Sequence, residues 1–177
     1  MTVPRIMFLT VLSLPLVAIV LCLLAGSGMA ERLHRHHNTY SISLVVSRTL
    51  TLVMVFMGVL GGLTSWLCRL GVFKQSPLLP LLFCLAFELT ILLMVMAVLR
   101  YQVMSYDDRI TVRGPFVSTR TIRHADIDRM EWRWSYLGPH LRDLWIHASD
   151  GTKTRIWCLV DVERLLLQID RYDVLRG

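Results

Sequence analysis

The chain has 177 residues, of which 54% are hydrophobic, and its formal net charge is +6. The mean hydropathy of +0.53 is high for a soluble domain. The first 99 residues carry six Arg and Lys against two Glu, so the polar remainder is nearly balanced in charge. This distribution argues against nucleic acid as a partner and suits a surface close to anionic lipid head groups.

Three stretches are long and apolar enough to cross a membrane, at about residues 7–25, 49–68 and 77–99. The first two contain no charged residue, and the third contains one, Glu88. A helix needs roughly 20 apolar residues to cross about 30 Å of hydrocarbon. Only helices and closed barrels satisfy their backbone hydrogen bonds in lipid. We therefore predict a three-helix transmembrane region over residues 1–99.

The first stretch also has features of a cleaved signal peptide. Arg5 precedes the apolar run, and Gly28-Met29-Ala30 forms a small-x-small end. The apolar core is longer than the roughly 7–15 residues of a signal h-region, which favours a retained helix.

The predicted orientation depends on basic residues near the helix ends. The first loop contains three arginines, and an Arg-rich segment begins at Arg100, whereas the other side has Arg5, Arg69 and Lys74. Because Lys and Arg favour the cytoplasmic side, we predict a multi-pass protein of the cell inner membrane. Its N-terminus would lie outside, with the first loop and the C-terminal domain in the cytoplasm.

The first loop also contains His34, His36 and His37, which raises the question of a metal site. Of the other ligand types, only Glu31 is nearby, so we interpret the segment as a basic interfacial loop. The four cysteines of the chain show neither a disulfide framework nor a CxxC spacing. No metal or other cofactor is predicted.

The second apolar stretch contains a G-x-x-x-G pattern formed by Gly58 and Gly62. Small residues of this kind allow another helix to approach closely. The loop over residues 69–76 is short, so the second and third stretches should form an antiparallel hairpin with Glu88 at the depth of the glycines. We predict that Gly58, Gly62 and Glu88 belong to a helix interface.

A carboxylic acid in a membrane costs several kcal/mol unless it is neutral or paired. Three interpretations of Glu88 remain open. It is a proton or ion carrier, a hydrogen-bonding residue at a helix–helix or partner interface, or a protonated residue of little consequence. The first would make the chain a small transporter or channel-like subunit, which is the alternative function.

From residue 100 the pattern changes to the two-residue alternation of β-strands. Asp150-Gly151 is a strong hairpin signal, "HADID" (124–128) predicts a short helical turn, and residues 161–174 have helical spacing with Asp161 as N-cap. Six strands are predicted, within 101–108, 109–114, 118–124, 127–134, 142–149 and 152–159. Their predicted core residues are Ile110, Val112, Ile122, Met130, Trp132 and Trp134.

This order resembles the bacterial pleckstrin-homology-like (PH-like) domains. The matching segments are "ITVRGPF", "TRTIRHADIDRMEW", "LWIHASDGTKTRIW" and "VERLLLQID", all within residues 101–174. The resemblance implies a small antiparallel PH-like domain over residues 100–177 with a C-terminal helix. Together with the three predicted transmembrane helices, it gives an α + β membrane protein. It also implies a binding or scaffolding role and no particular ligand.

The polar domain shows no nucleophile elbow, phosphate loop, HExxH or paired-carboxylate motif. His124 and Asp126 suit a base and its orienting group, but we interpret them as a polar turn between two strands. The four Trp residues at 132, 134, 145 and 157 suit a core or an interfacial belt better than a ligand stack. We therefore predict a protein that is not an enzyme.

Arginines are the better candidates for function, because they are concentrated in the first strands of the polar domain. The predicted partner- or lipid-binding residues are Arg109, Arg113, Arg120, Arg123, Arg129 and Arg133. We expect a PH-like domain that binds a membrane protein partner, a second copy of the chain or membrane lipids. The chain would then be an accessory or assembly subunit of a membrane complex.

Overall fold

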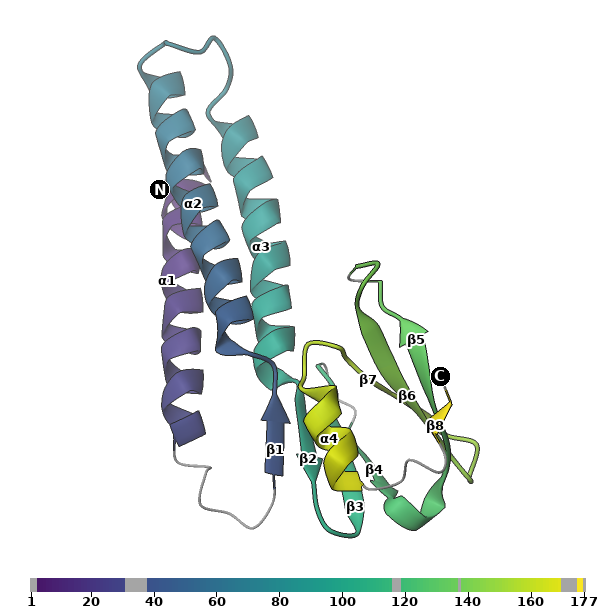
Figure 1. The fold of residues 1–177 in the computed structure, drawn as a ribbon. Coiled ribbons are helices and arrows are strands. Elements are labelled where there is room, and N and C mark those ends of the chain that lie inside the picture. The colour runs from purple at the N-terminus through teal and green to yellow at the C-terminus, as the bar shows by residue number, and fades with distance from the viewer. Residues whose placement is uncertain (1–2, 31–37, 116–118, 137, 170–174, 177) are drawn as a thin grey trace. The chain divides into compact units, whose positions relative to one another are not determined.

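The computed structural model describes residues 3–30, 38–115, 119–136, 138–169 and 175–176. The chain is α + β, with three long apolar helices followed by antiparallel sheets (Figure 1). It divides into two units. One comprises residues 1–31 and 44–98, and the other comprises residues 32–43 and 99–177.

The helical unit contains α1 (Val3–Ala30), α2 (Leu44–Arg69) and α3 (Leu78–Arg100). All three are long and apolar enough to cross a membrane, as the sequence predicted. α2 begins five residues before the predicted start near 49. The predicted apolar stretch began after Arg48 because this residue is charged. The helix nevertheless includes Arg48 and begins at Leu44.

Buried residues on α2 and α3 follow a seven-residue repeat. On α2 they are small or polar at 47, 51, 58, 61, 62 and 65, with Met54 between them; on α3 they lie at 81, 84, 88, 91, 95, 97 and 98. Steps that alternate between four and three residues keep one stripe of a helix against its neighbour. Because the stripe on α2 is made largely of Gly, Ser and Thr, the neighbouring helices approach its backbone closely.

Contacts at two glycines of α2 show that α2 and α3 run antiparallel, as predicted. A Cβ at Gly58 would lie 3.0 Å from Oε1 of Glu88, and one at Gly61 would lie 2.9 Å from Cβ of Cys84. Positions later on α2 therefore meet positions earlier on α3. α1 completes this packing through Val11, whose Cγ1 would lie 3.4 Å from a Cβ at Gly61.

The β unit contains two four-stranded sheets within the described residues. Sheet A has the order β1 (Asn38–Ser41), β2 (Gln102–Ser105), β3 (Arg109–Arg113) and β4 (Thr119–Arg123), and sheet B the order β7 (Lys153–Ile156), β6 (Arg142–Ala148), β5 (Ile127–Trp134) and β8 (Leu175–Arg176). The six predicted strands are confirmed as β2 to β7. The pairs are antiparallel, apart from β5 with β8.

The predicted short elements are also present. The 3₁₀ turn η2 (His124–Asp126) connects β4 to β5, and the hairpin of β6 and β7 turns at Gly151, whose φ is +82°. The helix α4 (Val162–Ile169) follows β7. Asp161 caps it, because its Oδ1 accepts a hydrogen bond from the backbone N–H of Arg164 at 3.2 Å.

Strand β1 was not predicted, and it makes the β unit discontinuous in sequence. It pairs antiparallel with β2, with Ser41 opposite Gln102. The whole of α2 and α3 is therefore inserted between two neighbouring strands of sheet A. Both covalent connections to the helices leave from the same end of the β1–β2 ladder.

The core of the β unit lies between the inward faces of the two sheets and α4. Its buried residues include Ile110, Val112, Ile122, Met130, Leu144, Ile146, Ile156 and Leu165. Trp132 is only half-buried, and the prediction that Trp134 belongs to the core is wrong, because its side chain is 63% exposed. Trp134 lies at the last pair of the β5–β6 ladder, opposite Arg142, whose guanidinium covers the ring at 4.5 Å.

Candidate functional site: a basic sheet face and a buried glutamate

Three of the six candidate arginines lie together on the outward face of sheet A. In the β3–β4 ladder Arg109 is opposite Arg123, and Arg113 is opposite Thr119. Their side chains alternate with the buried Ile110, Val112 and Ile122, so they point away from the core. We call Arg109, Arg113 and Arg123 the basic face.

The basic face has little charge compensation. Arg109 is 3.9 Å from Asp108, and its guanidinium lies over the ring of Tyr106 at 5.0 Å. Arg113 and Arg123 form no ion pair with any residue that the structure describes. Near an anionic surface each such basic residue contributes about 1 kcal/mol of attraction, so this face is suited to an acidic partner.

Arg120 has a different position, although it belongs to the same strand. It is opposite Val112, on the inward side of sheet A. Its Nη1 donates a hydrogen bond of 2.7 Å to the carbonyl oxygen of Lys153, which links the edge strand β4 to the edge strand β7. Arg120 is thus separate from the basic face.

Arg129 and Arg133 are held by one carboxylate on the outward face of sheet B. Both lie 3.1 Å from Glu131, and the guanidinium of Arg133 also covers the ring of Trp145 at 5.4 Å. The hydrogen bond from Arg133, together with the charge of Arg129, holds the pKa of Glu131 below its ordinary value. These two arginines are therefore partly neutralised and are weaker candidates for binding.

His147 lies beside the same carboxylate, with Nε2 3.7 Å from Oε2 of Glu131. Burial and the nearby charge of Arg129 lower the pKa of His147, which outweighs the opposing effect of Glu131. The imidazole of His147 is thus neutral at physiological pH. The ion pairs at this place are those of Glu131 with Arg129 and Arg133.

A second ion pair in sheet B is buried. Asp143 is 1% exposed and accepts hydrogen bonds from Arg155 at 2.8 Å and from the backbone N–H of Cys158 at 3.0 Å. Next to it the ring of Tyr101 stacks on Trp157, with centroids 4.7 Å apart. Burial raises the pKa of Tyr101 to about 12, so its hydroxyl stays protonated. The alternating sequence pattern did not predict the ion pair of Asp143 with Arg155.

The candidates on the long apolar helices separate into two contacts. Glu88 is fully buried next to Gly58, whereas Gly62 faces α1, where a Cβ would lie 3.6 Å from Cδ2 of Leu12. The carboxyl of Glu88 is enclosed by helices of its own chain, and within the described residues neither of its oxygens has a hydrogen-bond partner. The sequence analysis did not name Gly61 as an interface residue, although the seven-residue repeat that includes Gly61 is visible in the sequence.

A proline of α1 lies at the same place. A Cβ at Gly58 would be 3.1 Å from Cγ of Pro15 and 3.3 Å from the carbonyl oxygen of Val11. Pro15 has no N–H, so this carbonyl cannot receive the usual helical hydrogen bond from four residues further on. The carboxyl group of Glu88 and the carbonyl oxygen of Val11 therefore both lie beside Gly58 inside the helical unit.

The remaining candidates form no recognisable reactive centre. His124 and Asp126 lie in η2, where His124 is half-buried and Asp126 exposed. Among the described residues, no three His, Cys, Asp or Glu are grouped to hold a metal ion. His34, His36 and His37 lie outside the described residues. Comparison of the chain with protein-family models, curated proteins and solved structures gave no match.

Proposed function

We propose that the chain is a multi-pass protein of the cell inner membrane and that its β unit is a cytoplasmic PH-like domain. In this proposal the domain binds an acidic protein partner or the membrane surface, and the chain is an accessory or assembly subunit of a membrane complex. The length and apolar character of α1, α2 and α3 support the membrane part. Two antiparallel sheets followed by α4 support the PH-like part.

The basic face is the observation that carries the proposal. Arg113 and Arg123 are exposed and without an ion pair in the described part of the chain. The threonine-containing surface around them includes a hydrogen bond of 3.1 Å between the hydroxyls of Thr111 and Thr121. Complementary charge across an interface steers association and excludes wrong partners. Such a surface suits recognition better than chemistry.

Charge reversal on the basic face tests this function. The tagged full chain is extracted in a mild detergent, and the co-purified proteins and lipids are compared with those of the variant Arg113→Glu with Arg123→Glu. We expect at least about a tenfold loss of the partner, since like charges across an interface cost several kcal/mol. The matched control, Arg5→Glu with Lys74→Glu, should retain it. A monomeric wild-type chain with no partner and no bound anionic lipid would contradict the proposal.

The buried glutamate supports a second candidate function, a small transporter or channel-like subunit. Glu88 and the freed carbonyl of Val11 are the polar groups that meet beside Gly58. An ionisable residue enclosed by membrane helices is a candidate proton or ion carrier. In liposomes with a trapped pH indicator, Glu88→Gln should reduce proton flux at least about tenfold, whereas Glu163→Gln on α4 should not. No flux above empty liposomes in the wild-type chain would remove this candidate.

A further inference from the structure

The β unit exposes few large apolar side chains, and most of them lie in one short segment. Among its described residues there are four, and three of these, Trp134, Tyr136 and Leu141, lie where β5 connects to β6. The exposed fraction is 63% for Trp134 and 95% for Tyr136, and the fourth residue is Leu167 on α4. Exposed apolar side chains that gather at one place are characteristic of an interaction site. We call Trp134, Tyr136 and Leu141 the apolar tip.

The apolar tip lies at the end of the β unit that is joined to α3. Tyr101 directly follows Arg100, the last residue of α3, and its ring stacks on Trp157 with centroids 4.7 Å apart. The hydroxyl of Tyr101 donates a hydrogen bond of 3.4 Å to the carbonyl oxygen of Arg155, and the guanidinium of Arg155 lies over the ring of Tyr136 at 5.6 Å. Arg155 therefore contacts both the first residue after α3 and the apolar tip.

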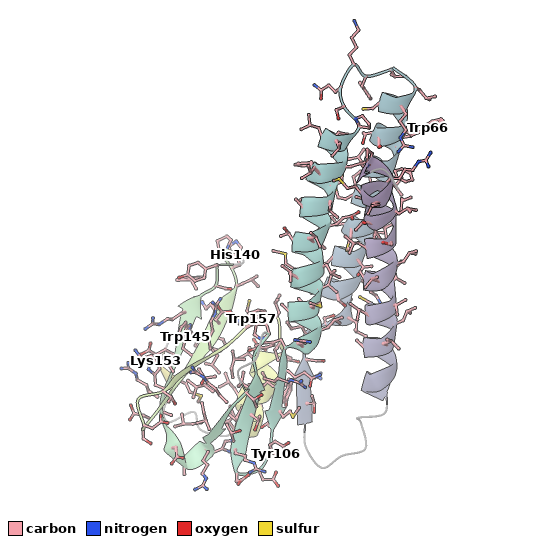
Figure 2. All side chains as sticks on the ribbon, turned by 180° about the vertical axis from the view of Figure 1, so that it is seen from behind. Trp66, Tyr106, His140, Trp145, Lys153 and Trp157 are labelled. Carbon is pink, nitrogen blue, oxygen red and sulfur yellow. The ribbon has the colours of Figure 1, made fainter. Side chains whose placement is uncertain are left out.

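The directions of the strands agree with this position. β2 runs from Gln102, next to α3, to the turn that contains Tyr106. Figure 2 shows Tyr106 and His140, which belongs to the β5–β6 connection, at opposite ends of the β unit. β1 ends at Ser41, opposite Gln102, shortly before α2 begins. Both connections to the helices therefore leave from the end that carries the apolar tip.

The side chains at the apolar tip are typical of a membrane interface. Trp and Tyr concentrate at the level of the lipid head groups, because each combines an apolar ring with a polar group. The guanidinium of Arg142 covers the ring of Trp134 at 4.5 Å, as that of Arg155 covers Tyr136. Arg142 forms no ion pair within the described part of the chain, so its donors suit a lipid phosphate.

Net charge is not what would hold the tip at a membrane. A groove of about 460 Å³ beside the tip is lined by Arg142 and His140, but also by Asp161 and Glu163. Asp161 pairs with Arg164 at 3.1 Å, which leaves the charges of Arg142 and Glu163 nearly balanced. The attraction must therefore come from the apolar side chains, and it should not depend on anionic lipid.

We propose that the apolar tip inserts into the lipid head-group region of the membrane that α3 crosses. The proposal rests on the membrane-spanning role proposed for the helices. It deepens the proposed function, because it names the residues through which the β unit meets the bilayer. Insertion removes the exposed rings of Trp134 and Tyr136 from water and gives the β unit a further attachment besides its two covalent connections.

The test measures how close the tip lies to lipid. In the full chain, with its four cysteines replaced by serine, His140→Cys carries a fluorescent label in the β5–β6 connection, and Asp107→Cys carries it in the turn at the opposite end. The chain is reconstituted at low density in phosphatidylcholine vesicles at high salt, with lipids that bear a nitroxide quencher near the head group. We expect quenching at position 140 to be at least about threefold that at position 107, because only the tip would reach the head-group level.

Variants of the tip separate insertion from simple proximity. Trp134→Gln with Tyr136→Gln should lower the quenching at position 140 to that at position 107. Both side chains are exposed, so the melting temperature, Tm, in detergent should stay level. Trp134→Phe with Tyr136→Phe keeps two aromatic rings and should retain the quenching. Leu167→Gln removes an equally exposed apolar side chain from α4 and should leave the quenching unchanged.

Each outcome decides the question. Strong quenching that only the glutamine variant of the tip removes supports the proposal. A blue-shifted emission without quenching would mean that a protein surface, such as a second copy of the chain, covers the tip. Weak quenching with the emission of a label in water would leave the tip in solvent. Either of these results, or an equal loss in Leu167→Gln, overturns the proposal.

The proposed function fails in different measurements. Arg113→Glu with Arg123→Glu should keep the quenching at position 140, because these residues do not belong to the apolar tip. Loss of an acidic partner in that variant is therefore measured independently of insertion. A chain that does not incorporate into vesicles would contradict the proposed membrane role itself, and this inference with it.

Discussion

Replacement of Asp143 by alanine is expected to lower the free energy of unfolding of the β unit by about 3 kcal/mol. The side chain is 1% exposed, Arg155 binds it through two nitrogens, and the backbone N–H of Cys158 donates to its second oxygen. Alanine would leave the guanidinium without its counter-charge and the N–H without an acceptor. The loss should fall at the lower end of the 3–5 kcal/mol range for broken buried pairs, because Arg155 is 29% exposed and retains access to water.

Tryptophan fluorescence during chemical denaturation of the full chain in detergent measures this loss. Four of the five Trp residues belong to the β unit, so the signal reports mainly on that unit. Asp108→Ala is the matched control, because its pair with Arg109 is exposed on both sides and should contribute less than about 1 kcal/mol. Equal losses in the two variants would show that the buried pair is not a main source of stability.

Replacement of Gly61 by alanine is expected to separate α2 from α3, whereas the same change at Gly62 should be tolerated. A Cβ at Gly61 would lie 2.9 Å from both Cβ and Sγ of Cys84, a distance that forces the helices to move. At Gly62 the nearest atom, Cδ2 of Leu12, would be at an ordinary contact distance of 3.6 Å. Overpacking of this kind costs about 1–3 kcal/mol, and the adjacent glycines make a matched pair.

Cys84 itself reports on this interface, since it is 3% exposed and lies directly against Gly61. In a chain whose other cysteines are replaced by serine, the rate at which a maleimide labels Cys84 measures opening of the helices. Gly61→Ala should raise this rate at least about tenfold, which corresponds to about 1.4 kcal/mol, and Gly62→Ala should leave it near the parent value. A faster rate for Gly62→Ala than for Gly61→Ala would contradict the packing described above.

Long regular elements could be predicted because their physical signals extend over many residues. The apolar stretches reveal three helices, and the alternation in "RITVRG" and "IDRMEWRW" reveals strands that are half-buried. The Asp150-Gly151 turn has a local cause, because Gly151 adopts a positive φ and Oδ1 of Asp150 accepts from the N–H of Thr152 at 2.8 Å. These features needed no knowledge of distant partners.

Features that depend on distant pairing could not be predicted. Only the register of β3 with β4 shows that Arg109 and Arg123 are neighbours while Arg120 turns toward β7. The buried pair of Asp143 with Arg155 likewise depends on the register of β6 with β7, because its members lie on neighbouring strands. Strand β1 has four residues, "NTYS", which are too few for a readable alternation, and its partner β2 lies far along the chain.

The position of β1 has a consequence for biosynthesis. Between Ser41 and Gln102 the ribosome must add about 60 residues, which include all of α2 and α3. Closing a flexible loop of that length carries an entropic cost, but an antiparallel helix hairpin already brings its two ends together. A chain whose hairpin fails to form would leave β2 as an unpaired edge, open to aggregation. Strand β1 can therefore pair with β2 only after both α2 and α3 have been synthesised.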